Sequence, residues 1–261
     1  MSSATHELLP GPPMPAPGER WALFLDVDGT LLDFALRPEL VRVEWALIGH
    51  LRELQRALDD AVVLVSGREV ADLQRLFAPL QISRVGLHGL EQHLVGSAYQ
   101  RAWHEQPEQI ARLGADADAI AARMPGVHVE RKGPCVALHC REAPSRMAEM
   151  SAAAQLLAER MPGYVTLRGY EVCEIKPAQA DKGMAVAALL EREPFIARRP
   201  VYLGDDHTDE SALRVVRERG GLAVAVGGRV SAAATHALPY PHAVRQWLAR
   251  LAQDLQAQGE H

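Results

Sequence analysis

Short apolar runs alternate with segments of helical periodicity along most of this chain, and that alternation narrows the folds open to it. Residues 21–25 (WALFL) and 61–65 (AVVLV) are continuous apolar runs, as is typical of strands buried on both faces of a sheet. A helical segment separates these two runs, and a second helix leads to a third run at residues 82–89. This βαβαβ order is typical of an α/β fold with a parallel sheet.

The pattern changes near Pro107, where two units of one helix and one strand pair follow each other, and the α/β pattern returns after Pro177. Two such units in succession predict a small α+β insert. We therefore expect an α/β fold in which a Rossmann-like parallel-sheet core, residues 20–106 and 178–261, is split by an inserted α+β cap domain, residues 107–177.

Helices are expected where apolar residues recur at helical spacing. They are residues 37–58, 69–76, 109–124, 145–161, 182–190, 210–219 and 242–256. Strands are expected at continuous or alternating apolar runs. They are residues 21–25, 61–65, 82–89, 200–206 and 222–227, with a hairpin at 89–104 and strand pairs at 127–141 and 164–177.

The composition excludes several classes of protein. The net charge is −5 with no basic run, which disfavours nucleic acid or an anionic membrane as a partner. No apolar run approaches the roughly 18 residues of a membrane span, and the start lacks the features of a signal peptide. The three cysteines form no CxxC pair, as expected of reduced thiols. We expect a monomeric, cytoplasmic protein whose Pro- and Gly-rich residues 1–19 form a flexible tail.

Polar side chains follow three of the predicted strands directly. Asp26 and Asp28 come after the first strand, Ser66 after the second, and Asp205 after the run VYLG. Ligands of open α/β sheets bind outside the carboxyl ends of the strands, so these groups are expected to meet there. Clustered carboxylates repel one another unless a cation neutralises them, and an all-oxygen set suits Mg²⁺. The sequence therefore predicts a magnesium site that handles an anionic substrate.

Four motifs in the right order give this site a family resemblance. DVDGT at Asp26, VSGR at Ser66, DKG at Lys182 and GDDHTDE at Gly204 resemble the motifs of haloacid dehalogenase-like phosphatases. The stretches ERKGPCVALHCR, EIKPAQADKG and GDDHTDESALRVV are similar to those of trehalose-6-phosphate phosphatases, from about residue 21 to 225. The resemblance implies a Mg²⁺-dependent phosphatase of trehalose biosynthesis, which hydrolyses trehalose 6-phosphate to trehalose and phosphate.

The resemblance also implies roles for the acidic residues. Asp26 would attack phosphorus and become an aspartyl phosphate, while Asp28 would pass a proton to the leaving sugar and then take one from water. Lys182 would place a positive charge on the phosphate and on Asp26. The metal ligands would be Asp26, Asp28 through its backbone carbonyl, and Asp205. Of the remaining two aspartates, Asp209 is expected to support the metal and Asp206 to cap a helix, although the reverse assignment stays open.

Several residues near these motifs fit two readings. Ser66 and the Gly67 backbone would bind the phosphoryl oxygens, although Ser-Gly is also ordinary turn chemistry. Arg68 would face either the phosphate or the surface. His88 would contact the substrate at the core–cap junction or serve as a structural histidine. Thr30 would cap a helix or belong to the site.

The predicted cap carries the candidate sugar-binding residues. They are Glu130, Lys132, Arg141 and Glu174, of which the last three match cap positions that bind the sugar in the resembling enzymes. A solvated strand face is the plain alternative for them. Arg131 stands where this family often has an acidic residue. His139 and His207 are expected to be structural or exposed.

Two other functions remain open at this stage. Another sugar-phosphate phosphatase of the superfamily, acting on sucrose phosphate or a mannosyl phosphate, would share the core and differ in the cap. A non-catalytic sugar-phosphate sensor would be expected to lack one of the motif residues. The residues in question are all present: Asp26, Asp28, Lys182 and Asp205.

Overall fold

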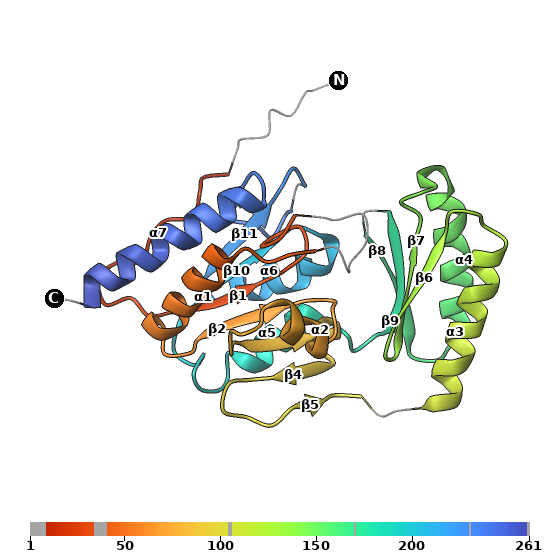
Figure 1. Ribbon diagram of the computed structural model, residues 1–261, viewed down its shortest axis with the longest axis horizontal. Coiled ribbons are helices and arrows are strands. Elements are labelled where there is room, and N and C mark those ends of the chain that lie inside the picture. Colours follow the sequence, from red (N-terminus) through yellow and green to blue (C-terminus); the bar gives the residue numbers. More distant parts are fainter. Residues whose placement is uncertain (1–8, 34–40, 104–105, 170, 230, 260–261) are drawn as a thin grey trace, which may run out of the picture.

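A computed structural model describes residues 9–33, 41–103, 106–169, 171–229 and 231–259 of the chain (Figure 1). It contains an eight-stranded sheet with the order β12-β11-β10-β1-β2-β3-β4-β5. The six strands from β12 to β3 are parallel, and β4 and β5 are antiparallel at one edge. Their bounds are β1 Trp21–Leu25, β2 Val62–Val65, β3 Ser83–Gly86, β4 Glu91–His93, β5 Gln100–Arg101, β10 Arg199–Gly204, β11 Leu222–Val226 and β12 His236–Leu238.

Helices cover both faces of this sheet, as its apolar strands require. Trp21 of β1 stacks on Trp247 of α7, with ring centroids 6.3 Å apart, whereas Phe24 contacts Phe195, which follows α5. Residues three apart on a strand point to opposite faces, so α7 and the segment after α5 lie on opposite sides of β1. The helices of this part are α1 Trp45–Ala57, α2 Val70–Leu76, α5 Lys182–Leu189, α6 Glu210–Glu218 and α7 Pro241–Gly259.

A second, four-stranded antiparallel sheet has the order β6-β7-β9-β8. Figure 1 shows one face of this sheet turned toward the eight-stranded sheet, with α3 and α4 packed on the other face. The buried residues between the sheet and these helices form an apolar cluster of their own. The elements are α3 Pro107–Ala122, β6 His128–Lys132, β7 Cys135–His139, α4 Met147–Glu159, β8 Tyr164–Gly169 and β9 Val172–Pro177.

The sequence prediction of a parallel-sheet α/β fold is confirmed, with local differences. The helix expected at 37–58 begins at Trp45: residues 37–40 lie outside the described part, and Glu44 is extended. Strand β12 was not expected, because three residues are too few to show alternation. Short 3₁₀ turns occur at η2 Leu87–Gly89, η3 Pro144–Arg146 and η4 His207–Asp209.

The N-terminal segment differs from the flexible tail expected for residues 1–19. Residues 1–8 lie outside the described part, but within residues 9–19 Pro12 and Pro15 are buried and Met14 packs against the core. The Trp247 indole N–H donates to the Pro12 carbonyl over 3.1 Å, and the Ala237 N–H of β12 donates to the Pro10 carbonyl. Proline carbonyls are good acceptors although proline has no N–H to donate, so this segment can hold the sheet edge without forming a strand.

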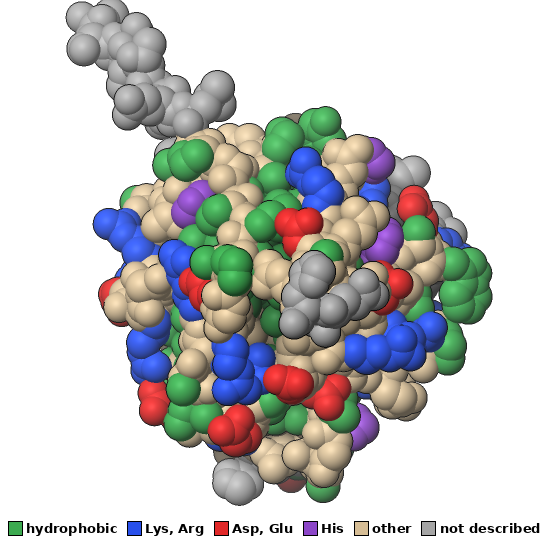
Figure 2. Space-filling model, turned by 90° about the vertical axis from the view of Figure 1, so that its left-hand side faces the viewer, with side chains coloured by type: hydrophobic (Ala, Val, Ile, Leu, Met, Phe, Trp, Pro, Cys, Tyr) green, Lys and Arg blue, Asp and Glu red, His purple; other side chains and the backbone are tan. Residues whose placement is uncertain are grey.

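The face farthest from the four-stranded sheet mixes charges of both signs. Figure 2 shows Lys and Arg side chains there interspersed with Asp and Glu. Faces that bind nucleic acid instead concentrate positively charged side chains. No helix within the described ranges is both long enough and apolar enough to cross a lipid bilayer.

Candidate active site

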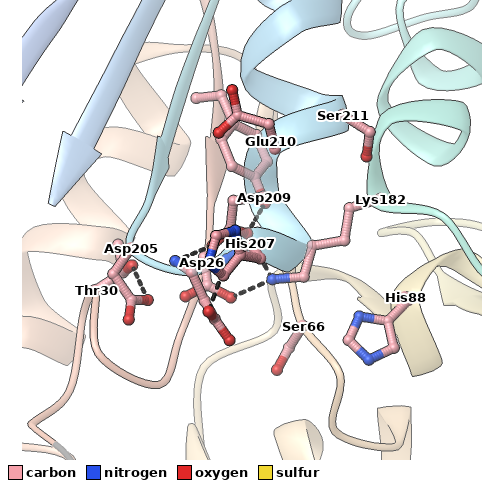
Figure 3. Close-up of polar contacts among 12 residues, drawn as sticks. Asp26, Thr30, Ser66, His88, Lys182, Asp205, His207, Asp209, Glu210 and Ser211 are labelled. Carbon is pink, nitrogen blue, oxygen red and sulfur yellow. Dashed lines mark hydrogen bonds and ion pairs between the residues drawn. The ribbon is translucent and has the colours of Figure 1, made fainter. Parts of the chain in front are cut away.

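The strand order brings the predicted site residues to one edge of the large sheet. β1 lies between β10 and β2, so the turns that carry Asp26, Ser66 and Asp205 are neighbours (Figure 3). Asp26 is 4% exposed and Ser66 is 1% exposed. Buried polar groups of this kind need partners: Asp26 Oδ1 accepts from Lys182 Nζ, and Ser66 Oγ accepts the Arg68 backbone N–H.

Lys182 comes to the same place from the start of α5. Asp181 caps that helix by accepting the Met184 N–H, and α5 then begins at Lys182. Gly183 lets α5 approach α6, because an added Cβ would lie 2.6 Å from the Ser211 backbone. The DKG motif therefore combines a helix cap, a site lysine and a close helix contact.

Lys182 links two buried carboxylates. Its Nζ lies 2.6 Å from Asp26 Oδ1 and 2.6 Å from Asp209 Oδ1 (Figure 3). Burial opposes the ammonium charge, but the charges of Asp209 and Asp26 outweigh it and raise the pKa of Lys182. The lysine is therefore a fixed positive charge beside the Asp26 carboxylate.

Asp209 is held from behind the site. Its Oδ1 accepts the Tyr202 hydroxyl over 2.6 Å as well as Lys182, and its Oδ2 accepts the Asp206 N–H over 3.0 Å. Asp206 accepts the His207 N–H and caps η4, as one of the two sequence readings had it. Tyr202 is a residue that the sequence reasoning missed, since a tyrosine in an apolar strand reads as core.

Three carboxylates gather closely enough to share one cation. Asp26, Asp205 and Asp209 each offer an oxygen, and these oxygens lie within 4.8 Å of one another. Burial, and then the charge of Asp209, raise the pKa of Asp26 well above its usual range and that of Asp205 to about 7. A divalent cation would relieve this repulsion, so an oxygen-only set of this kind fits Mg²⁺.

Arg68 faces the site rather than the surface. Its Nε and one terminal nitrogen each lie 2.7 Å from an oxygen of Asp28, which makes a two-pronged ion pair. The Arg68 backbone N–H also donates to Ser66 Oγ over 3.1 Å. Of the two readings of Arg68, the structure therefore favours the one in the site, with Asp28 as its partner. Thr30 likewise belongs to the site, because its hydroxyl donates to Asp205 over 3.0 Å.

The four-stranded sheet presents a polar row to these groups. Ala137 pairs with Glu130 on one side and with Glu174 on the other, so the three side chains share a face. Glu130 accepts from His139 over 2.9 Å and pairs with Lys132 over 3.1 Å. Burial opposes the charge, but these two partners lower the pKa of Glu130 to about 2. His139, expected to be structural or exposed, is thus the partner of a site carboxylate.

A cavity of about 150 Å³ lies between the two sheets. All the predicted site residues except Asp209 line it. They are Asp26, Asp28, Ser66, Gly67, Arg68, His88, Glu130, Lys132, Arg141, Glu174, Lys182 and Asp205. Asp209 is fully buried behind Lys182. The geometry can therefore place a phosphate at the carboxylates and lysine, with its alcohol against the four-stranded sheet.

Two curated proteins are similar to this chain over most of its length. The chain is 39% identical over 236 residues to a protein of Sinorhizobium fredii named probable trehalose-phosphate phosphatase, covering 90% of this chain and 88% of that protein. It is 34% identical to the trehalose-6-phosphate phosphatase of Escherichia coli, covering 93% of this chain and 90% of that protein.

The fold is also found among solved structures. The C-terminal domain of the C. albicans trehalose-6-phosphate phosphatase matches with a TM-score of 0.80 at 21% identity, covering 90% of this chain and 92% of that one. Residues 24–246 match the sequence model of the trehalose-phosphatase family. With most of its length matched by the family and by full-length relatives, the chain belongs to the trehalose-phosphatase family.

Proposed function

We propose that this protein hydrolyses trehalose 6-phosphate to trehalose and phosphate, with Mg²⁺, through an aspartyl-phosphate intermediate. The observation that carries the proposal is the Lys182 ammonium 2.6 Å from Asp26, beside the oxygens of Asp205 and Asp209. A nucleophilic carboxylate, a fixed cation and a metal-binding set are what transfer of a phosphoryl group requires.

Asp26 is the nucleophile in this account. One of its oxygens bonds to phosphorus while the bond from phosphorus to the sugar oxygen breaks, and Asp28 gives that oxygen a proton. Water oxygen then bonds to phosphorus while Asp28 takes a proton from it. The bond from phosphorus to the Asp26 oxygen breaks, which restores the Asp26 carboxylate and releases inorganic phosphate. Lys182 neutralises charge on Asp26 and on the phosphoryl oxygens throughout.

Arg68 and Asp28 must separate for this chemistry. Both Asp28 oxygens accept N–H groups of Arg68, so neither is available to exchange a proton with the sugar oxygen while that pair lasts. We expect Arg68 to turn to the substrate phosphate, which is the stronger anion, and so to free Asp28. Ser66 and the Gly67 backbone lie beside it in the cavity and would bind the phosphoryl oxygens.

The metal would be held by the carboxylates of Asp26 and Asp205 and the backbone carbonyl of Asp28. When bound, Mg²⁺ supplies positive charge to the phosphoryl group as it is transferred. Both oxygens of Asp209 already accept hydrogen bonds from the protein, so we assign Asp209 to holding Lys182 and supporting the metal from behind.

The inserted residues 107–177 would act as a mobile cap over the sugar. The cavity of about 150 Å³ is smaller than the roughly 300–1,000 Å³ of typical small-molecule pockets, so a disaccharide phosphate needs the cap to open. Closure would then exclude bulk water and bring Lys132, Arg141 and Glu174 onto the sugar hydroxyls.

A panel of phosphorylated sugars tests the substrate. Phosphate release would be measured from trehalose 6-phosphate, sucrose 6-phosphate, a mannosyl phosphate and glucose 6-phosphate, with Asp26→Asn protein as the control. We expect kcat/KM to be highest for trehalose 6-phosphate and turnover to fall by at least about 10³-fold in Asp26→Asn. Comparable turnover of several sugars would favour a broader sugar phosphatase, and activity retained in Asp26→Asn would overturn the nucleophile.

A further inference from the structure

His88 and Glu174 form a buried pair between the two sheets. His88 Nε2 lies 2.7 Å from Glu174 Oε2, and the two residues are 4% and 8% exposed. His88 belongs to η2 of the core and Glu174 to β9 of the four-stranded sheet. Both line the cavity, and Figure 3 shows Ser66 between the His88 ring and Asp26. The pair therefore lies beside the phosphate site on the sugar side.

The backbone is bent to bring the histidine to this place. Leu87 and His88 have φ values of 48° and 55°, in the left-handed region that side chains other than glycine seldom adopt. Backbone hydrogen bonds from Leu87 to Arg68 and from His88 to Ser66 hold this conformation against the motif turn. Gly67 makes room for the ring, because an added Cβ would lie 2.7 Å from it. Strain of this kind persists where the surrounding structure enforces it, often at functional sites.

Each member of the pair keeps one polar atom without a hydrogen bond in the described part of the chain. These atoms are His88 Nδ1 and Glu174 Oε1, both buried. A buried polar atom without a partner is costly, and a ligand that supplies one recovers that cost. Burial opposes ionisation of Glu174, but the charges of His88 and Lys132 lower its pKa to about 2. The unpartnered oxygen is therefore a charged acceptor, suited to a hydroxyl donor.

We propose that His88 is a positioning residue that holds the Glu174 carboxylate so that its second oxygen accepts a hydroxyl of the bound sugar. This inference rests on the proposed function. It adds that His88, on the large sheet's side of the cavity, orients the carboxylate that binds the sugar. A phosphate ester without hydroxyls gains nothing from this arrangement. A site built to bind a hydroxyl discriminates strongly against substrates that lack it.

The test compares two substrates across four proteins. The kcat/KM values of wild type, His88→Asn, Glu174→Gln and the double variant are measured for trehalose 6-phosphate and for p-nitrophenyl phosphate. Asparagine tolerates the positive φ but cannot reach Glu174. We expect the ratio of the two kcat/KM values to fall by about 10–100-fold in each single variant, as loss of a charge-assisted hydrogen bond predicts. The double variant should be no worse than the worse single one.

Controls separate this role from folding and from the proposed function. His93→Asn, on β4 outside the cavity, should leave both kcat/KM values unchanged. If His88→Asn does not fold, His88→Gly replaces it, because glycine adopts this φ without strain. An unchanged ratio, or equal losses for both substrates, would overturn the role of His88. Wild-type protein that leaves trehalose 6-phosphate intact would instead refute the proposed function.

Discussion

Lys182 is surrounded by charges that would each be costly to bury alone. It is 2% exposed, and its ammonium contacts one oxygen of Asp26 and one of Asp209. Removing one partner of such a buried set leaves an uncompensated charge, which typically costs about 3–5 kcal/mol. The network therefore fixes the position of the lysine more firmly than a surface ion pair would.

Tyr202→Phe tests whether this network extends behind the site. The substitution keeps the buried ring but removes the hydroxyl that donates to Asp209. We expect the free energy of unfolding to fall by about 1–2 kcal/mol and kcat for trehalose 6-phosphate to fall about tenfold, with KM little changed. Urea denaturation and steady-state kinetics check both, with Tyr164→Phe on β8 as the matched control. An unchanged kcat would show that Tyr202 only packs.

Residues within the motifs could be picked out from the sequence, whereas a contact that depends on strand pairing could not. Asp26 and Asp28 directly follow a predicted strand, and Lys182 is indicated by the resemblance of its DKG motif to the phosphatase family. The contact of His139 with Glu130 depends on how β6 pairs with β7, where the two residues are nine apart in sequence. No local sequence pattern indicates that strand pairing, so His139 was expected to be structural or exposed.

At the scale of elements, the N-terminal segment shows that amino-acid composition alone does not predict tertiary contacts. Its prolines suggested disorder, yet the carbonyls of Pro10 and Pro12 accept hydrogen bonds from β12 and α7. These contacts join residues far apart in the chain, so amino-acid composition could not predict them. Most strands and helices could be predicted, because the spacing of apolar residues within each element is visible in the sequence.

Trp247→Phe tests the contact between the segment and α7. The buried ring still packs on Trp21, but the hydrogen bond to the Pro12 carbonyl is lost. We expect the free energy of unfolding to fall by about 1–2 kcal/mol in urea denaturation. Trp45→Phe, at a position that is 75% exposed, should change it by less than about 0.5 kcal/mol. Equal small effects of both substitutions would mean that the contact adds nothing to stability.

The sheet β6–β9 should lose stability in acid. The pKa of Glu174 is lowered from 4.5 to about 2, against burial, by the charge and hydrogen bond of His88. A carboxyl group whose pKa is lower in the folded than in the unfolded protein stabilises the fold fully above the unfolded pKa. That stabilisation is lost as the pH falls toward the folded pKa. Wild-type stability should therefore decline between pH 4.5 and pH 2.

Thermal unfolding across that range, without substrate, checks this dependence. Glu174→Gln should make the decline shallower, because the glutamine amide has no proton to gain. Glu218→Gln, on the exposed side of α6, is the control and should follow the wild type. A Glu174→Gln profile as steep as that of the wild type would assign the acid sensitivity to other groups.

At the scale of the molecule, the two sheets enclose the cavity of the candidate site, and the contact between them is close. An added Cβ at Gly169, at the end of β8, would lie 2.8 Å from Asp206 of the core. The order of elements in the sequence predicts a parallel-sheet core and an inserted segment. The close contact between Gly169 and Asp206 could not be predicted, because it joins residues far apart in the chain.

Phosphate release from trehalose 6-phosphate, measured with Mg²⁺ and again with excess chelator, tests the central claim most directly. If Asp26, Asp205 and Lys182 act around one divalent ion, turnover should fall by at least about 100-fold on chelation and return when Mg²⁺ is restored in excess. Turnover that continues undiminished in the chelator would contradict the account.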